Sequence, residues 1–158
     1  MFPAWEPRVI EVPITVTLDA YTAGDAVGGL LTSDSIPQIK GGGYIAWVRL
    51  YDAAAQSEPF KLWCFYDAPT TIANDAAFTM VAADWAFWFT TIDIAAADYD
   101  ATGDDVCAMV CGKDTLSDDY HMFPYLADGV MYFYLVPSAT PDYAAATDLT
   151  MHICFMLE

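Results

Sequence analysis

The acidic segment 98–105 places oxygen-bearing side chains at alternate positions and a glycine at the sixth. This spacing is typical of the first half of a calcium-binding loop, whose twelfth residue is a bidentate Glu. Here the twelfth residue is Met109, inside a stretch that reads as a strand. We therefore expect a solvated loop, and we retain Asp98, Asp100 and Asp104 only as weak candidates for a calcium site.

Thiols and imidazoles are the usual ligands of zinc, and Cys107, Cys111, His152 and Cys154 are the residues that could share one ion. On a strand, Cys107 and Cys111 share a face but lie about 13 Å apart, so one ion cannot bind both while the strand is intact. No short C-x-x-C pair supports a zinc site. We predict no metal, and we expect all four cysteines, Cys64 included, to be reduced and packed as small hydrophobic residues.

Catalysis needs groups that the sequence does not combine. His121 has Asp118 and Asp119 close to it in the chain, a combination that suggests a hydrolase. No G-x-S-x-G elbow, metalloprotease helix or papain-like cysteine context accompanies it. The segment 24–29 is rich in glycine but lacks the Lys-Ser/Thr of a phosphate loop. The sequence therefore predicts a protein that is not an enzyme and uses no cofactor.

The charge balance excludes two classes of partner. The 158-residue chain has 22 acidic residues against five Lys and Arg, which gives a formal net charge of −17. Binding to nucleic acid or to an anionic membrane draws its free energy from clustered cations, so we expect neither partner. No apolar stretch is long enough to cross a membrane, and the N-terminus lacks a signal-peptide pattern. These features predict a soluble protein that folds in the cytoplasm.

Eight stretches have the residue types or the alternation of β-strands. They are Val9–Leu18, Tyr21–Leu31, Tyr44–Tyr51, Phe60–Tyr66, Trp88–Ile94, Val106–Cys111, Val130–Val136 and Leu149–Leu157. Pro13 cannot donate a ladder hydrogen bond, which favours an edge strand or a bulge for the first stretch. The third and fourth stretches predict a hairpin. The regular spacing predicts an all-β fold, an antiparallel β-sandwich or jelly roll with one short helix.

The short helix is expected after Asn74-Asp75, a pair that can cap a helix N-terminus. Its apolar residues at helical spacing are Phe78, Val81, Ala82 and Trp85. No Gly/Ser-rich or Pro-rich linker divides the chain. We therefore expect an extended N-terminal arm over residues 1–8 and a single sandwich domain over residues 9–158.

Aromatic residues exceed what a thin sandwich can hide. The chain has five Trp, ten Tyr and nine Phe, and in the stretches 60–66 and 130–136 they occupy both faces of a strand. Such a second face is covered either by excursions of the same chain or by a neighbouring subunit. We favour a neighbouring subunit, in an oligomer or an assembled complex. The candidate interface residues are Trp5, Trp47, Trp63, Phe65, Trp85, Trp88, Tyr132 and Tyr134.

Turn motifs follow one another in a defined order along the chain. They are DAYTAGDAVGG at 19–29, GGG at 41–43, FYDAP at 65–69, NDAA at 74–77, TPDY at 140–143 and DLT at 148–150. This order resembles small virion proteins of tailed bacteriophages. The structural residues of these motifs are turn positions, Gly24, Gly28, Gly29, Pro69 and Pro141, where the glycines are expected at positive φ or at close backbone approaches.

The resemblance implies a structural protein of the virion, in the first place a head decoration (cement) protein that assembles in the host cytoplasm. Its implied partners are the major capsid protein or another virion protein, and copies of itself in a trimer. The crowded Trp and Phe residues of segment 85–89 depart from the pattern and put a shared partner surface in doubt. Two alternatives stay open: a tail or neck component, and a carbohydrate-binding module that stacks Trp47 and Trp63 on sugar rings.

Overall fold

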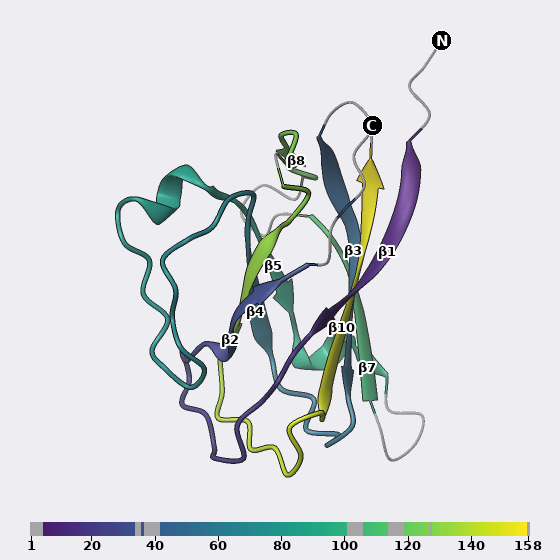
Figure 1. Cartoon of the computed structure of the whole chain (residues 1–158). Coiled ribbons are helices and arrows are strands. Elements are labelled where there is room, and N and C mark those ends of the chain that lie inside the picture. Colours follow the sequence, from purple (N-terminus) through teal and green to yellow (C-terminus); the bar gives the residue numbers. More distant parts are fainter. Residues whose placement is uncertain are drawn as a thin grey trace.

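The computed structural model describes residues 5–33, 36, 42–100, 106–113, 119–126 and 128–157. Two antiparallel sheets pack face to face, so the prediction of an all-β sandwich is confirmed (Figure 1). The larger sheet has the order β1 (Glu6–Pro13), β10 (Leu149–Leu157), β3 (Gly43–Asp52), β7 (Val106–Cys111), β6 (Tyr99–Asp100), with β8 (Met122–Phe123) also paired to β3. The smaller sheet has the order β2 (Val27–Thr32), β9 (Tyr132–Pro137), β4 (Phe60–Phe65), β5 (Trp88–Ile94).

The core lies between the two sheets and is built from alternate residues of each strand. In β4, the side chains of Phe60, Leu62 and Cys64 are at most 1% exposed and belong to this core. Met151 and Ile153 of β10 face them from the other sheet and are fully buried. Burial of one such side chain stabilises the fold by about 1.5–3 kcal/mol, which explains why the alternation in the sequence fixes the faces of the strands.

Most strand predictions agree with the structure. The bounds of β5, β7 and β10 are those expected from the sequence, and β1 is an edge strand as Pro13 indicated. The expected arm is too long, because β1 already pairs with β10 at Glu6 opposite Leu157. Residues 1–4 lie outside the described part of the chain.

The predicted hairpin between the third and fourth stretches is wrong, because β3 and β4 belong to different sheets. The cause is Asp52, which is fully buried at the end of β3. Its carboxylate accepts hydrogen bonds from the N–H groups of Ala54, Gln56 and Ser57 at 2.9, 2.9 and 3.1 Å. Ala55 and Ser57 have positive φ. The carboxylate thus shapes a corner that carries the chain from one sheet to the other.

The predicted helix after Asn74 is also wrong, because residues 74–76 form a turn and residues 77–81 have no helical structure; the 3-10 turn at Asp84–Ala86 is the helical part of this segment. The Asn74 side chain does not cap a helix, because it accepts hydrogen bonds from Tyr21 Oη and Gly28 N and donates one to Thr15 O. Asp75 has a φ of 62°, which ends any helical turn there. Two short 3-10 turns, η1 (Asp84–Ala86) and η2 (Ala96–Asp98), are the helical elements of the described chain. No described helix has the length and apolar character to cross a membrane.

Candidate protein-binding surface

The outer face of the four-stranded sheet is covered by the chain itself. Residues 67–87, here called the excursion, leave β4 and return to β5 across that face (Figure 1). Beneath them Phe65 and Tyr134 are 0% and 1% exposed. The ring of Phe78, from the excursion, lies 5.2 Å from Trp63 and 5.1 Å from Tyr134. The aromatic residues on the second face of this sheet therefore need no neighbouring subunit to cover them.

A buried carboxylate holds the excursion together. Asp84, which is 3% exposed, accepts hydrogen bonds from Thr70 N, Thr70 Oγ1 and Val81 N at 2.8, 3.0 and 3.1 Å. Burial alone would raise the pKa of Asp84, but the hydrogen bonds from Thr70 and Val81 outweigh it and lower that pKa below its usual value. The Tyr134 hydroxyl fastens the same segment to β9, since it donates to Thr70 O and accepts from Ile72 N.

The outer face of the six-stranded sheet has no such cover, and no described segment crosses it between β1 and β7 (Figure 1). We call this the open face and define it by the outward residues of four strands. They are Val9 and Glu11 of β1; Thr150, His152, Cys154 and Met156 of β10; Tyr44, Trp47, Arg49 and Tyr51 of β3; and Cys107, Met109 and Cys111 of β7. Val9 and Met109 are 56% and 59% exposed at its two sides.

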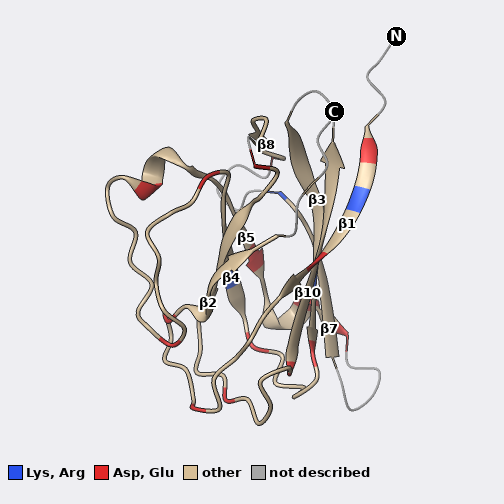
Figure 2. Cartoon of the chain, in the orientation of Figure 1, with Lys and Arg blue, Asp and Glu red and all other residues tan. Residues whose placement is uncertain are grey.

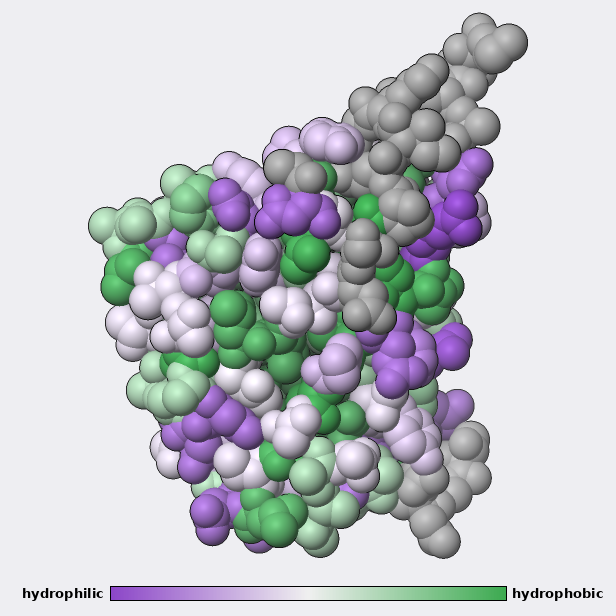
Figure 3. Space-filling view, viewed as in Figure 1, coloured by the Kyte–Doolittle hydropathy of each residue, from purple (hydrophilic) through white to green (hydrophobic). Residues whose placement is uncertain are grey.

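The open face is nearly neutral although the chain carries a net charge of −17. Over β10, β3 and β7, all of whose residues in this face are described, it presents no carboxylate; Asp52 of β3 is buried in the opposite direction. Glu11 of β1 and Arg49 of β3 balance each other. Figure 2 shows that most acidic residues lie instead in loops and turns, many of them at the lower end of the sandwich. Figure 3 shows that apolar residues also gather in the middle of the side that displays β1 and β2.

Arg49 links two of the apolar side chains of the open face. Its guanidinium lies 5.3 Å from the centre of the Trp47 ring, and its Nη2 is 3.8 Å from Met109 Sδ. Trp, Tyr, Met and Arg are the residues enriched at protein interfaces, whereas Asp, Glu and Lys are depleted there. The open face therefore shares several of the residue types that are enriched at protein interfaces.

A row of aromatic rings extends the open face across one end of the sheet. The Tyr44 ring lies 5.4 Å from Trp5 and 5.0 Å from Tyr120. The Lys113 ammonium lies 5.9 Å from the centre of the Tyr120 ring. Tyr120 is 40% exposed, so the row offers ring surface together with one cation.

The structure divides the predicted interface residues into three groups. Trp5 and Trp47 lie on the open face or its aromatic row. Phe65 and Tyr134 are buried, and Trp63, Trp88 and Tyr132 pack against them beneath the excursion. Trp85 is 53% exposed on the excursion. Phe65 and Tyr134 are thus not available to a partner, which corrects the expectation drawn from the sequence.

Sequence reasoning missed Tyr44, Met109 and Val9 as surface residues. The signal that could have found them is the strand period, because each alternates with a core residue: Ile45, Ala108 or Val12 fixes which side faces inward. The predicted interface residues are mostly aromatic residues of strands that carry rings on both faces, and the excursion covers these residues.

The residues considered for metals and catalysis are dispersed. The described residues form no group of three or more His, Cys, Asp or Glu that could hold a metal ion. Cys107 and Cys111 are separated by β3 from His152 and Cys154. Asp98 Oδ2 accepts a hydrogen bond from Ala95 N in η2, Asp100 is exposed on β6, and Asp104 lies outside the described residues.

The catalytic alternative had His121 at its centre. His121 Nδ1 lies 2.7 Å from Phe89 O, so a proton on this nitrogen is donated to a backbone carbonyl of β5. Asp119 is exposed, and Asp118 is not among the described residues.

Of the predicted turn glycines, Gly24 lies in a turn, whereas Gly28 and Gly29 lie within β2, at its register irregularity between Val27 and Leu31. Gly24, Gly28 and Gly29 have φ values of 95°, 77° and 71°. A Cβ on Gly29 would come within 3.0 Å of Asn74 N, so β2 and the excursion approach closely there. Pro69 and Pro141 are buried, and Pro141 O accepts a hydrogen bond from Tyr21 N at 2.9 Å.

Comparison with known proteins adds no relative to this description. No protein-family model, no curated protein and no solved structure matches the chain.

Proposed function

We propose that this protein is a non-enzymatic structural module that binds a neighbouring protein subunit through its open face. One observation carries the proposal: the chain covers the outer face of one sheet with its own excursion and leaves the other, which bears Tyr44, Trp47 and Met109, uncovered by described residues. Contiguous apolar surface on a soluble domain marks an interaction site.

The electrostatics favour a protein partner. The rest of the surface is strongly acidic, so it repels nucleic acid, anionic membranes and other acidic proteins. The open face carries few charged side chains, so few charges have to be desolvated when a partner surface covers it. Four strands about 4.8 Å apart, the longest of ten residues, give it an area of roughly 500–600 Å², which reaches the lower range of specific interfaces once side-chain relief is included.

The setting that we propose is the virion of a tailed bacteriophage, with the major capsid protein as the partner of a decoration protein. Its support is the ordered turn motifs of the sequence, together with a rigid β scaffold that offers one binding face and an acidic exterior. A tail or neck position uses the same face on another virion protein. Localisation by cryo-electron microscopy on the particle separates these two positions.

The sugar-binding alternative has less support. The Trp63 ring lies 5.2 Å from Phe78 and 6.1 Å from Trp88, so the excursion occupies the surface that a sugar ring would need. Of the two tryptophans considered for stacking, only Trp47 lies on the open face, and Arg49 already lies over its ring.

Co-sedimentation with capsid shells of the encoding phage tests the proposal. Val9→Asp and Met109→Asp each place a carboxylate on the open face at an exposed position, so they spare the fold. We expect each to weaken binding by about tenfold or more. Val81→Asp, on the exposed side of the excursion, is the matched control and should bind like the wild type. Wild-type affinity in both open-face variants would contradict the proposed surface.

A further inference from the structure

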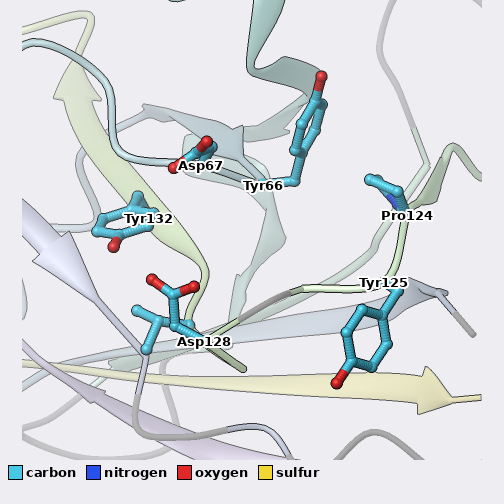
Figure 4. Close-up of a pocket in the computed structure, with 7 residues that line it drawn as sticks. Tyr66, Asp67, Pro124, Tyr125, Asp128 and Tyr132 are labelled. Atoms are coloured by element: carbon cyan, nitrogen blue, oxygen red, sulfur yellow. The ribbon is translucent and has the colours of Figure 1, made fainter. Parts of the chain in front are cut away.

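A second surface feature lies away from the open face, where the excursion begins. It is a shallow pocket of about 180 Å³. Its lining residues are Tyr66, Asp67, Pro124, Tyr125, Asp128, Val130 and Tyr132. Figure 4 shows Tyr132 beside Asp67 and Asp128 on one side of the pocket, and Pro124 and Tyr125 on the other. The two carboxylates thus flank the Tyr132 ring, Tyr125 lies across the pocket from them, and the Tyr66 hydroxyl points away from them.

Hydrogen bonds fix the walls of this pocket. Tyr66 Oη donates to Ala86 O, and the Tyr66 ring meets Phe87 edge to face at 6.2 Å. Asp128 lies in a turn closed by the hydrogen bond from Gly129 N to Leu126 O, with Gly129 at a φ of 69°. These contacts hold the Tyr66 ring and the backbone at Asp128 in place, which lowers the entropic cost of binding at these two walls.

Within the described part of the chain, no cation pairs with either of the two aspartates. Arg8 pairs with Glu6, and Lys61 pairs with Asp93. Arg49 and Lys113 lie over rings of the open face and its aromatic row. None of these four cations, which are all that the described residues contain, is an ion-pair partner of Asp67 or Asp128. Burial, followed by the charges of Asp128 and Asp67, raises the pKa of Tyr132, which agrees with carboxylates close to that ring.

We propose that this pocket binds an organic cation, an alkylammonium or guanidinium group, between its tyrosine rings and its two carboxylates. Ring faces attract such cations electrostatically, and nearby carboxylates add to the attraction. A neutral sugar can donate hydrogen bonds to the two carboxylates, but it does not neutralise their charge. A calcium ion takes six to eight oxygen ligands and does not use ring faces. The pocket and the open face share no residue, so this inference is independent of the proposed function.

Titration of the full-length protein with n-butylammonium, followed by NMR shifts of the tyrosine rings, tests the inference. We expect saturable binding in the millimolar range that weakens as salt is added. Asp67→Asn, Asp128→Asn and Tyr125→Ala should each reduce affinity about fivefold or more; Tyr125 is 59% exposed, so its loss spares the fold. Asp19→Asn changes an exposed carboxylate elsewhere and should leave the affinity unchanged.

Parallel titrations identify the class and source of the ligand. n-Butanol, the neutral analogue, and a disaccharide should not bind; if either binds more tightly than n-butylammonium, the inference is wrong. Binding of Nα-acetyl-lysine methylamide as tightly as n-butylammonium indicates a lysine side chain of a protein, whereas binding of the free amine alone indicates a small metabolite. No binding of any cation, or binding unchanged in both aspartate variants, would overturn the inference.

Discussion

Two buried carboxylates shape the parts of this chain that are not strands. Asp52 organises the corner between β3 and β4, and Asp84 closes the excursion. Each accepts three hydrogen bonds, yet the pKa shifts differ in direction. Burial raises the pKa of Asp52 in spite of its hydrogen bonds, whereas at Asp84 the hydrogen bonds prevail and the pKa is lowered. The two residues therefore give separate tests.

Asp84→Ala should destabilise the protein by about 2 kcal/mol, because it leaves the N–H groups of Thr70 and Val81 without their acceptor. Urea unfolding at neutral pH measures the change. Asp19→Ala, at an exposed carboxylate, should stay within about 0.5 kcal/mol of the wild type. Equal stability of the two variants would show that Asp84 does not hold the excursion.

The Asp84→Asn and Asp52→Asn variants should each differ in stability from the wild type, and these two differences should change with pH in opposite directions. A lowered folded-state pKa at Asp84 contributes stability above the unfolded value of about 3.9, and this is lost as pH falls through the folded pKa. A raised pKa at Asp52 means that the native state binds the proton more tightly, so its contribution is present at low pH and lost as pH rises through the folded pKa. Urea unfolding between about pH 7 and pH 3 measures both slopes.

At the scale of elements, the sequence predicts strands well and connections poorly. The strands β5, β7 and β10 follow from alternating or continuous apolar residues, because burial of alternate side chains is a local and repeated signal. The corner at Asp52 depends on a buried carboxylate that accepts hydrogen bonds from the next few residues of the chain. The course of the chain after Asn74 depends on a side chain that bonds to a distant backbone group, Thr15 O. Helical spacing of apolar residues could not outweigh those bonds.

The open face and the pocket also contain some features that the sequence predicts and others that it does not. Outward positions of predicted strands are readable from the period of two, so Trp47 and Met109 could be assigned to one face. Which face stays open could not be predicted, because it depends on where residues 67–87 fold back. The aspartates of the pocket are 61 residues apart in number, Asp67 and Asp128, and no local pattern connects them.

Phe78→Ala tests whether the excursion is a packed cover. The variant removes a ring from between Trp63 and Tyr134 and should cost about 2 kcal/mol, less than for a fully buried Phe. It should also speed proteolysis within 67–87 while the sandwich stays folded, as judged by near-ultraviolet circular dichroism and limited digestion. Thr79→Ala, at the exposed neighbouring position, is the control and should resemble the wild type.

At the scale of the whole molecule, three layers follow one another: the excursion, the four-stranded sheet and the six-stranded sheet (Figure 1). The acidic surface keeps an apolar-rich chain from associating at random. Any specific contact is then directed to the side where charge is balanced, the open face. We propose that self-association uses this same face, since the excursion hides the other sheet.

The trimer expected from the sequence is tested by light scattering on the purified chain. A mass three times that of the 17.3 kDa chain, lost in Met109→Asp and kept in Val81→Asp, is the expected result. A wild-type chain that stays monomeric at high concentration contradicts the trimer and leaves binding to another subunit as the role of the open face.

Cysteine alkylation in the assembled state tests the open face most directly, because Cys111 is an exposed thiol on it whereas Cys64 and Cys154 are buried. The measurement compares the maleimide reaction rate of Cys111 in the free chain with that in the complex with capsid shells. An Ala83→Cys variant provides a reference thiol on the exposed side of the excursion. We predict that assembly slows the reaction at Cys111 by about tenfold or more and leaves position 83 unchanged. Equal rates at Cys111 in the free and assembled states, or protection at position 83 instead, would contradict the account.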